Sequence, residues 1–200
     1  MARLPALVDA LVAVDGRERV VIDNVARAVR EGGWIQTTKR GRGAAEMTAG
    51  DAAALVVGLY GAGGMVEAPA AVERFSRLRR RRDLAFDGVV PARLGPLCRS
   101  RTVLDATANL IELGPWIDGT DRIEEVGAGA QDRFRVALTL NRPTPFAQVR
   151  VSWWTPAGSH TSLDLQFVGR LDRRLPAYDV ATTVNGPVFL TLHRATAPAA

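Results

Sequence analysis

Basic side chains at helical spacing are the chemical feature of this chain that most directly implies a partner. Arg27 and Arg30 lie in residues 17–31, a segment that predicts a helix ending at Gly32 and Gly33. Guanidinium is planar, permanently charged and able to donate two hydrogen bonds to one phosphate, so the pair indicates contact with DNA. Both arginines are expected to point away from the apolar face of the helix, which is formed by Val21, Ile22, Val25 and Val29.

A short basic loop follows this helix and adds donors of the same kind. Gly41 and Gly43 stand on either side of an arginine and give the backbone freedom to approach a phosphate wall or a minor groove. Threonine hydroxyls add neutral donors that often bind phosphate oxygens. The alternative is a solvated surface loop whose charges only aid solubility. The candidate nucleic-acid contacts of the loop are Thr37, Thr38, Lys39, Arg40 and Arg42.

A second group of arginines ends the helix expected over residues 70–84. Successive positions on a helix point about 100° apart, so four adjacent arginines cannot share one face. Such a run suits nonspecific contact with a DNA or RNA backbone better than recognition of bases. The alternative is a solvated helix end, where cations interact favourably with the helix dipole. The candidate contacts in this group are Arg77, Arg79, Arg80 and Arg81.

The remaining reactive residue types do not form a catalytic or metal-binding pattern. Cys98 is the single cysteine, and His160 and His193 are the two histidines, so a zinc site would lack ligands. Ser159 is adjacent to His160, but side chains diverge in an extended segment, and the sequence contains no Gly-x-Ser-x-Gly elbow. A phosphate-binding Gly-x-x-x-x-Gly-Lys pattern is absent as well. We therefore expect a protein that is not an enzyme and that uses neither a metal nor another cofactor.

The net charge of +5 is unevenly distributed along the 200 residues. Residues 61–101 carry nine basic and four acidic side chains, whereas residues 102–200 carry nine and ten. All basic residues except Lys39 are arginines, a bias that a GC-rich genome also produces, so their placement matters more than their number. The sequence has no apolar run of membrane-spanning length and no signal pattern at its start. We expect a cytoplasmic protein without a membrane partner.

The apolar pattern changes from a period near 3.6 to a period of two after Pro115. Helices are expected before this point, and the third of them begins at a capping box formed by Thr48 and Asp51. The expected helices cover residues 4–14, 17–31, 48–60, 70–84 and 102–113, and the expected strands cover 134–140, 147–153, 162–168, 178–184 and 188–193.

This order predicts an α+β fold, with a helical N-terminal region followed by a small antiparallel β-sheet. Residues 1–84 are expected to form a helical DNA-binding region, and residues 102–200 a helix with the antiparallel β module. Residues 85–101 are expected to be a linker or loop because they are rich in glycine and proline. A typical domain of about 150 residues leaves room for one domain or two small ones.

The passage from the helix into the basic loop resembles a known DNA-binding fold. The letters VREGGWI, followed by TTKRGRG, are similar to the step from recognition helix to wing in winged-helix domains of the helix-turn-helix class. The resemblance covers roughly residues 1–60, and it departs from the family where a capped helix follows the loop in place of a returning wing strand. The same region also resembles uncharacterised phage and prophage proteins of GC-rich bacteria. The winged-helix resemblance implies a DNA-binding head whose helix over residues 17–31 enters or crosses a groove of DNA.

The sequence therefore predicts a DNA-binding protein, namely a transcriptional regulator of the phage or prophage type with a β-rich module for dimerisation or ligand sensing. A homo-oligomer is expected, and DNA is favoured over RNA. Two alternatives stay open. One is a phage structural, assembly or DNA-packaging protein, and the other is an RNA-binding protein that works through residues 77–82.

Overall fold

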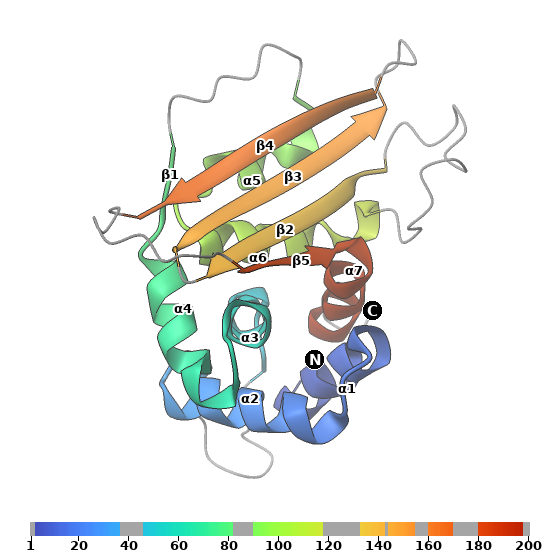
Figure 1. The fold of residues 1–200 in the computed structure, drawn as a ribbon. Coiled ribbons are helices and arrows are strands. Elements are labelled where there is room, and N and C mark those ends of the chain that lie inside the picture. Colours follow the sequence, from blue (N-terminus) through green and yellow to red (C-terminus); the bar gives the residue numbers. More distant parts are fainter. Residues whose placement is uncertain are drawn as a thin grey trace.

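The computed structural model describes residues 3–36, 46–81, 90–117, 133–142, 144–154, 160–169 and 180–197. These stretches form an α+β fold in which helices pack on one face of a five-stranded antiparallel sheet (Figure 1). The predicted fold class is thereby confirmed. The N-terminal region contains the helices α1 (Leu4–Asp15), α2 (Arg19–Glu31), α3 (Ala49–Gly61) and α4 (Ala68–Ser76), with the short 3-10 helix η1 (Met65–Glu67) before α4.

The middle of the chain adds the helices α5 (Gly95–Arg99) and α6 (Val103–Glu112), with η2 (Ala92–Leu94) before α5 and η3 (Gly114–Trp116) after α6. A capping box begins both α3 and α6. The hydroxyl of Thr48 accepts from the backbone N–H of Asp51 at 3.2 Å, and the hydroxyl of Thr102 accepts from that of Asp105 at 3.1 Å. The expected start of α3 at Thr48 is therefore confirmed.

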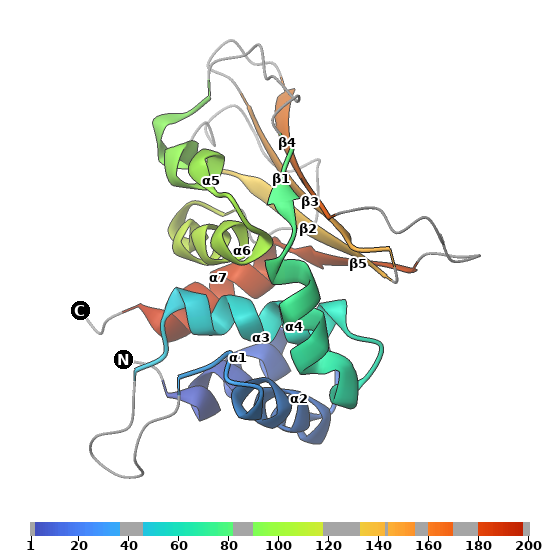
Figure 2. The same cartoon turned by 90° about the vertical axis from the view of Figure 1, so that its left-hand side faces the viewer.

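The sheet has the strand order β1-β4-β3-β2-β5, and every neighbouring pair is antiparallel. Alternate side chains of its central strands, such as Val136, Leu138 and Leu140, are buried because they face the helical layer. Figure 2 shows the helices gathered on one side of the sheet. The strands are β1 (Arg79–Arg80), β2 (Arg135–Arg142), β3 (Phe146–Trp154), β4 (His160–Val168) and β5 (Val180–Asn185).

Helix α3 lies at the centre of the helical layer. Every residue from Asp51 to Gly61 is buried, so the helix has no face left for solvent. It contacts α2 and α4, as well as α6, α7, β2 and β5. The contact with α2 is close, because a Cβ added at Gly58 would lie only 2.6 Å from Cγ2 of Val29. Glycine at position 58 thus fixes how near α2 can lie to α3.

The strand expected at residues 188–193 is wrong, because this segment is part of the helix α7 (Gly186–Thr196). Pro187 occupies the first turn of that helix, where its missing N–H costs no hydrogen bond. Val188, Phe189 and Leu192 are buried at helical spacing. The helix packs beside α1 and η3, so the last element of the fold contacts the first.

Two expectations for residues 70–101 are also wrong. The helix expected over residues 70–84 ends at Ser76, and Arg79 and Arg80 form an edge strand that pairs with Val168 and Phe167 of β4. The buried side chain of Leu78 separates α4 from this strand, so pairing with β4 overrides the helical tendency of the arginine run. The segment expected as a loop contains η2 and α5.

The buried side chains of the expected N-terminal and C-terminal regions form a single hydrophobic core. The hydrophobic core is one cluster that includes Leu7 and Leu55 from the helical region, and Leu140 and Phe189 from the β-rich region. Helix α3 packs against α6, and α1 packs against α7. The packing therefore joins the two regions on both sides of residues 85–101.

Substitution of Gly114 tests the docking of α7 on η3. A Cβ at position 114 would lie 2.3 Å from the Cβ of His193, an atom that cannot move without the helix backbone. We expect Gly114→Ala to lower the free energy of unfolding by about 1–3 kcal/mol because of this overpacking. Gly64→Ala is the control, since a Cβ there meets no atom within 4 Å. Equal urea midpoints for the two variants would contradict the position of α7.

Candidate nucleic-acid interface

Helix α2 presents Arg27 and Arg30 to solvent, as the sequence predicts. Both side chains are exposed, whereas Ile22, Val25 and Val29 on the opposite face are buried. Val21 was expected on the buried face, and this expectation is wrong because its side chain is exposed. Ala26 takes part in the buried face in its place. The buried stripe therefore has the expected four residues but is shifted around the helix, away from Val21 and toward Ala26.

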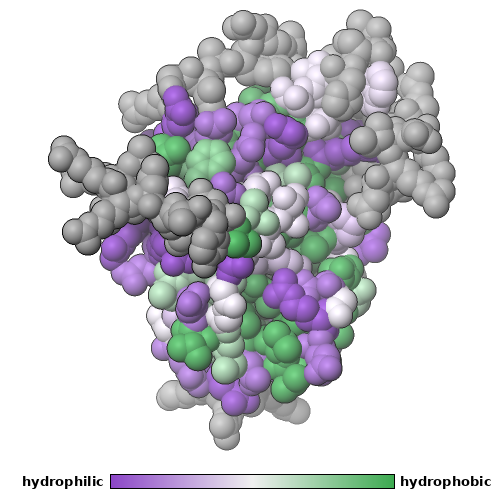
Figure 3. All heavy atoms as spheres, viewed as in Figure 1, coloured by the Kyte–Doolittle hydropathy of each residue, from purple (hydrophilic) through white to green (hydrophobic). Residues whose placement is uncertain are grey.

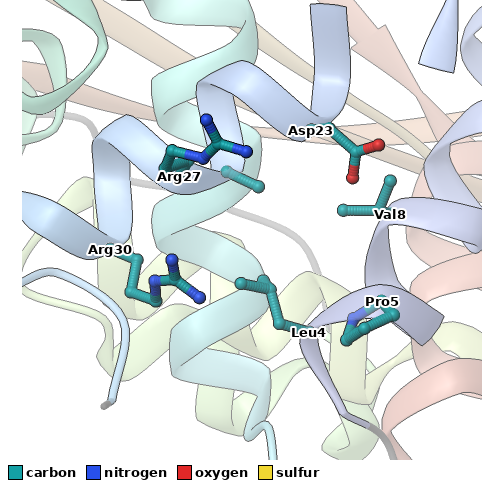
Figure 4. A pocket seen from close by; sticks show the side chains of 7 residues that line it. Leu4, Pro5, Val8, Asp23, Arg27 and Arg30 are labelled. Carbon is teal, nitrogen blue, oxygen red and sulfur yellow. The ribbon is translucent and has the colours of Figure 1, made fainter. Parts of the chain in front are cut away.

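A groove between α1 and α2 brings the two arginines to one site (Figure 4). Its volume is about 320 Å³. The helix α1 lines it with apolar side chains, and α2 contributes one acid and both arginines. The lining residues are Leu4, Pro5, Val8, Asp23, Ala26, Arg27 and Arg30. This arrangement combines two cations with an apolar floor, which suits a ligand that carries negative charge beside a flat or aliphatic surface.

The positive charge of α2 is concentrated in its C-terminal half. Near the start of the helix, Arg19 is ion-paired with Asp9 of α1 and with Asp23, which lies four residues further on. The hydrogen bond from Arg19 to Asp9 raises the pKa of the guanidinium, so this arginine is charged but compensated. Within the described stretches, neither Arg27 nor Arg30 forms an ion pair. These two arginines are thus available to an external anion.

The beginning of α2 is held by Arg17, which joins the turn after α1 to the end of α3. Its guanidinium pairs with Asp15 at 2.8 Å and donates to the carbonyl of Leu59 at 3.0 Å. It also lies over the ring of Tyr60, 4.8 Å from the centroid. Burial raises the pKa of the Tyr60 phenol, so the ring stays neutral beneath the cation.

The segment that follows α2 is held to the start of α3 by one buried carboxylate. Oδ1 of Asp51 accepts from the backbone N–H of Gln36 at 3.0 Å. Oδ2 accepts from both the backbone N–H and the hydroxyl of Thr48, at 2.9 and 2.7 Å. A single side chain therefore fixes the residue before the basic loop and a residue just after it.

The basic loop itself lies outside the described residues, which stop at Gln36 and resume at Glu46. The predictions for its five candidate contacts stay predictions. Its attachment points are nevertheless defined, because Asp51 holds Gln36 and Thr48 beside each other. Gln36, the last described residue before the loop, follows the end of α2 by five positions and lies at the start of α3. The loop residues concerned are Thr37, Thr38, Lys39, Arg40 and Arg42.

The second group of arginines is engaged with the protein itself. Arg77 pairs with Glu73, and Arg79 donates to the carbonyl of Ser76 at 2.7 Å, near the end of α4. The side chain of Arg80 donates to the carbonyl of Cys98, and the backbone N–H of Arg81 donates to a carbonyl of β4. The contacts of Arg79 and Arg80 join β1 to α4 and α5, whereas that of Arg81 belongs to the sheet.

The two groups of arginines lie at opposite ends of α4. Gly32, at the end of α2, lies close to Pro69 in the first turn of α4, whereas β1 follows the last turn. Nine helical residues separate these ends, a distance of about 13 Å. The structure therefore brings Arg27 and Arg30 together but does not add Arg77, Arg79, Arg80 or Arg81 to that site.

Two features were not anticipated from the sequence. The first is the bond from Gln36 to Asp51, which joins the segment after α2 to the first turn of α3 and has no local sequence pattern. The second is a cavity of about 260 Å³ beside α6, where the guanidinium of Arg93 stacks on the ring of Trp116 at 3.4 Å from its centroid. Arg93 and Trp116 are 23 positions apart, so no spacing rule connects them.

Comparison with protein-family models, with curated proteins and with solved structures finds no match for this chain. In the part of the chain that the structure describes, no group of three or more histidine, cysteine, aspartate or glutamate side chains is placed to hold a metal ion. No helix in that part combines the length and the apolar character that a membrane span requires.

Replacement of Asp51 tests the attachment of the loop. Asp51→Ala removes three accepted hydrogen bonds at a buried position, and we expect a loss of about 2–4 kcal/mol in the free energy of unfolding. Asp105→Ala is the matched control, because the exposed capping box of α6 lacks the bond to a second segment. It should cost about 1 kcal/mol, as should Thr48→Ala. Equal losses for Asp51→Ala and Asp105→Ala in urea unfolding would show that the bond to Gln36 contributes nothing.

Proposed function

We propose that the protein binds duplex DNA through the C-terminal half of α2. The observation that supports this most directly is the pair Arg27 and Arg30, which are exposed, line one groove and form no ion pair within the described stretches. Residues 37–45 would extend the same basic surface, because their attachment at Gln36 follows the end of α2. The acids at the start of the helix compensate Arg19, so a polyanion is attracted to the other end.

The contacts proposed for the two basic parts differ in kind. A major groove about 12 Å wide admits a helix, so Arg27 and Arg30 of α2 can reach the edges of bases. Guanidinium groups prefer the O6 and N7 atoms of guanine at such positions. Lys39, Arg40 and Arg42 would instead contact phosphates or a minor groove from the loop. The helix would supply the sequence preference and the loop much of the affinity.

The resemblance to winged-helix domains would give α2 the role of the reading helix. Helix α3 does not suit that role, because it is buried on all sides. We propose a transcriptional regulator of the phage or prophage type, acting in the cytoplasm as a homo-oligomer.

Crosslinking of the tagged protein to DNA across a genome would test this role, and enrichment at a few promoters is the expected outcome. Uniform coverage of the genome would instead favour a packaging or structural protein.

The first test of DNA binding addresses the loop through its salt dependence. Each phosphate contact releases about 0.9 counterion from B-form DNA. Alanine at Lys39, Arg40 and Arg42 together should flatten the plot of log affinity against log salt by up to about 3 units. Fluorescence anisotropy with a labelled duplex measures the slope. The alanine triple variant of Arg77, Arg79 and Arg80 is the control and should change the slope less. If the variant of Arg77, Arg79 and Arg80 changed the slope more than the loop variant, the interface would lie at β1, and nonspecific or RNA binding would be favoured.

The second test addresses the arginines of α2. Arg27→Ala and Arg30→Ala should each cost about 1–3 kcal/mol on a preferred sequence and little on a random duplex, because a bidentate contact to a base is lost. Arg150→Ala serves as control, since Arg150 is exposed but already bonded to Asp164 on the sheet. Selection from a random duplex library supplies the preferred sequence. Unchanged sequence preference in both α2 variants would remove α2 from the interface.

A further inference from the structure

The cavity beside α6 combines apolar side chains with charged and polar groups. Its volume is about 260 Å³. An apolar cavity of about 150 Å³ holds a benzene molecule, and sites for drug-sized ligands begin at about 300 Å³. Leu97 and Leu113, which are 2% and 6% exposed, line the cavity together with Pro96. The space therefore suits a small molecule with an apolar part of a few carbon atoms.

The cavity lies on the side of the sheet that carries the helices. Helices α5 and α6 are behind the sheet in Figure 1 and beside each other in Figure 2. Figure 3 shows the opposite side of the molecule, where hydrophilic residues are interspersed with hydrophobic ones. Among the described residues, none lines both this cavity and the groove between α1 and α2. A ligand in the cavity would therefore occupy a site separate from the candidate DNA-binding residues.

The cationic group of the cavity is Arg93 of η2. Its guanidinium lies over the ring of Trp116, 3.4 Å from the centroid, and the attraction between cation and ring orients the side chain. Stacking uses the flat face of the guanidinium, whereas its N–H donors point outward in the plane of the group. This fork of donors matches the two oxygens of a carboxylate. Arg93 can thus bind a carboxylate while it remains stacked on Trp116.

The acceptors of the cavity come from α6, where Asn109 and Glu112 are three positions apart and share a face. Nδ2 of Asn109 donates to the carbonyl of Pro96 at 3.2 Å and to the hydroxyl of Ser100 at 2.9 Å. These bonds use both hydrogens of the amide and leave Oδ1 as an acceptor. Glu112 is exposed and forms no ion pair within the described stretches. This pair of acceptors suits an ammonium group, which only donates.

We propose that this cavity binds a free α-amino acid with an aliphatic side chain. The carboxylate of the ligand would accept from Arg93, and its ammonium group would donate to Glu112 and to Oδ1 of Asn109. Its side chain would pack against Leu97 and Leu113. A ligand with only a negative charge is repelled by Glu112, and one with only a positive charge is repelled by Arg93, so both charges are required.

Isothermal titration calorimetry without DNA tests this binding independently of the proposed function. The full chain is titrated with L-leucine and, separately, with L-valine and L-isoleucine. We expect saturable binding at one site per chain, with a Kd of about 0.1–1 mM for ligands of about nine non-hydrogen atoms. Absence of saturable heat for all three amino acids up to about 10 mM would overturn the proposal.

Two analogues of leucine test the class of ligand. Leucinamide lacks the carboxylate, and 4-methylpentanoate lacks the ammonium group. Each should bind at least about tenfold more weakly than leucine, because each loses a charge-assisted hydrogen bond and leaves one charge of the cavity opposed to its own. An analogue that binds as tightly as leucine would show that the cavity does not recognise a zwitterion.

Exchange of the two charged residues tests the location of the site. Glu112→Gln should weaken leucine binding at least about tenfold and should not weaken the binding of 4-methylpentanoate. Arg93→Gln should weaken leucine binding to a similar extent and should not weaken that of leucinamide. Glu31→Gln and Arg99→Gln are the matched controls, since both residues are exposed and neither lines the cavity.

The controls should bind leucine as the parent does, and the circular dichroism and urea midpoint of every variant are compared with those of the parent. Parent-like leucine binding in Glu112→Gln or in Arg93→Gln would overturn the proposal. Equal losses in the controls and in the cavity variants would place the binding elsewhere on the protein and overturn it as well.

Discussion

Helix α3 has no polar face, and the arrangement of the fold follows from the need to cover it. Its residues from Asp51 to Gly61 are all removed from solvent. A helix that is apolar all round is stable in water only when other elements enclose it. The enclosure consists of α2 and α4 on one side, α6 and α7 on another, and the ends of β2 and β5. The sheet, the helical layer and helix α2 are thus positioned by one buried element.

The same constraint explains where polar groups inside the fold are found. Burial of α3 leaves the N–H groups of its first turn in need of partners, and the capping box at Thr48 supplies one. The Asp51 carboxylate, buried with the helix, needs hydrogen-bond donors and finds them in Thr48 and Gln36. Satisfying a buried charge therefore also fixes the path by which the chain leaves α2. The candidate interface depends on this path, since the basic loop begins there.

Much of the fold can be predicted from the sequence, because its longer elements have clear periods. The alternation in β2 and β3 and the capping residues before α3 and α6 identify these elements from local signals. The prediction for the segment of α7 was wrong because Val188 to His193 is short and apolar enough to fit the period of a strand or of a helix. Only Pro187, which suits the first turn of a helix, distinguishes the two. The prediction of a helix through the arginine run was wrong because the strand that pairs with Arg79 and Arg80, β4, lies more than 80 residues away in the sequence. Of the candidate site, the exposure of Arg27 and Arg30 was predictable, whereas the exposure of Val21 was not, since it depends on how the other helices pack against α2.

The contact between α1 and α7 constrains the order in which the protein can fold during synthesis. Synthesis proceeds from the N-terminus, so α1 leaves the ribosome long before α7 exists. Until then, the surface of α1 that α7 covers has no partner in the nascent chain. The mixed sheet and helix core also contains many contacts between distant residues, which form slowly. The contact with α1 therefore forms only after residues 186–196 have been synthesised, and a chain that stops before residue 186 displays unburied apolar surface to chaperones and proteases.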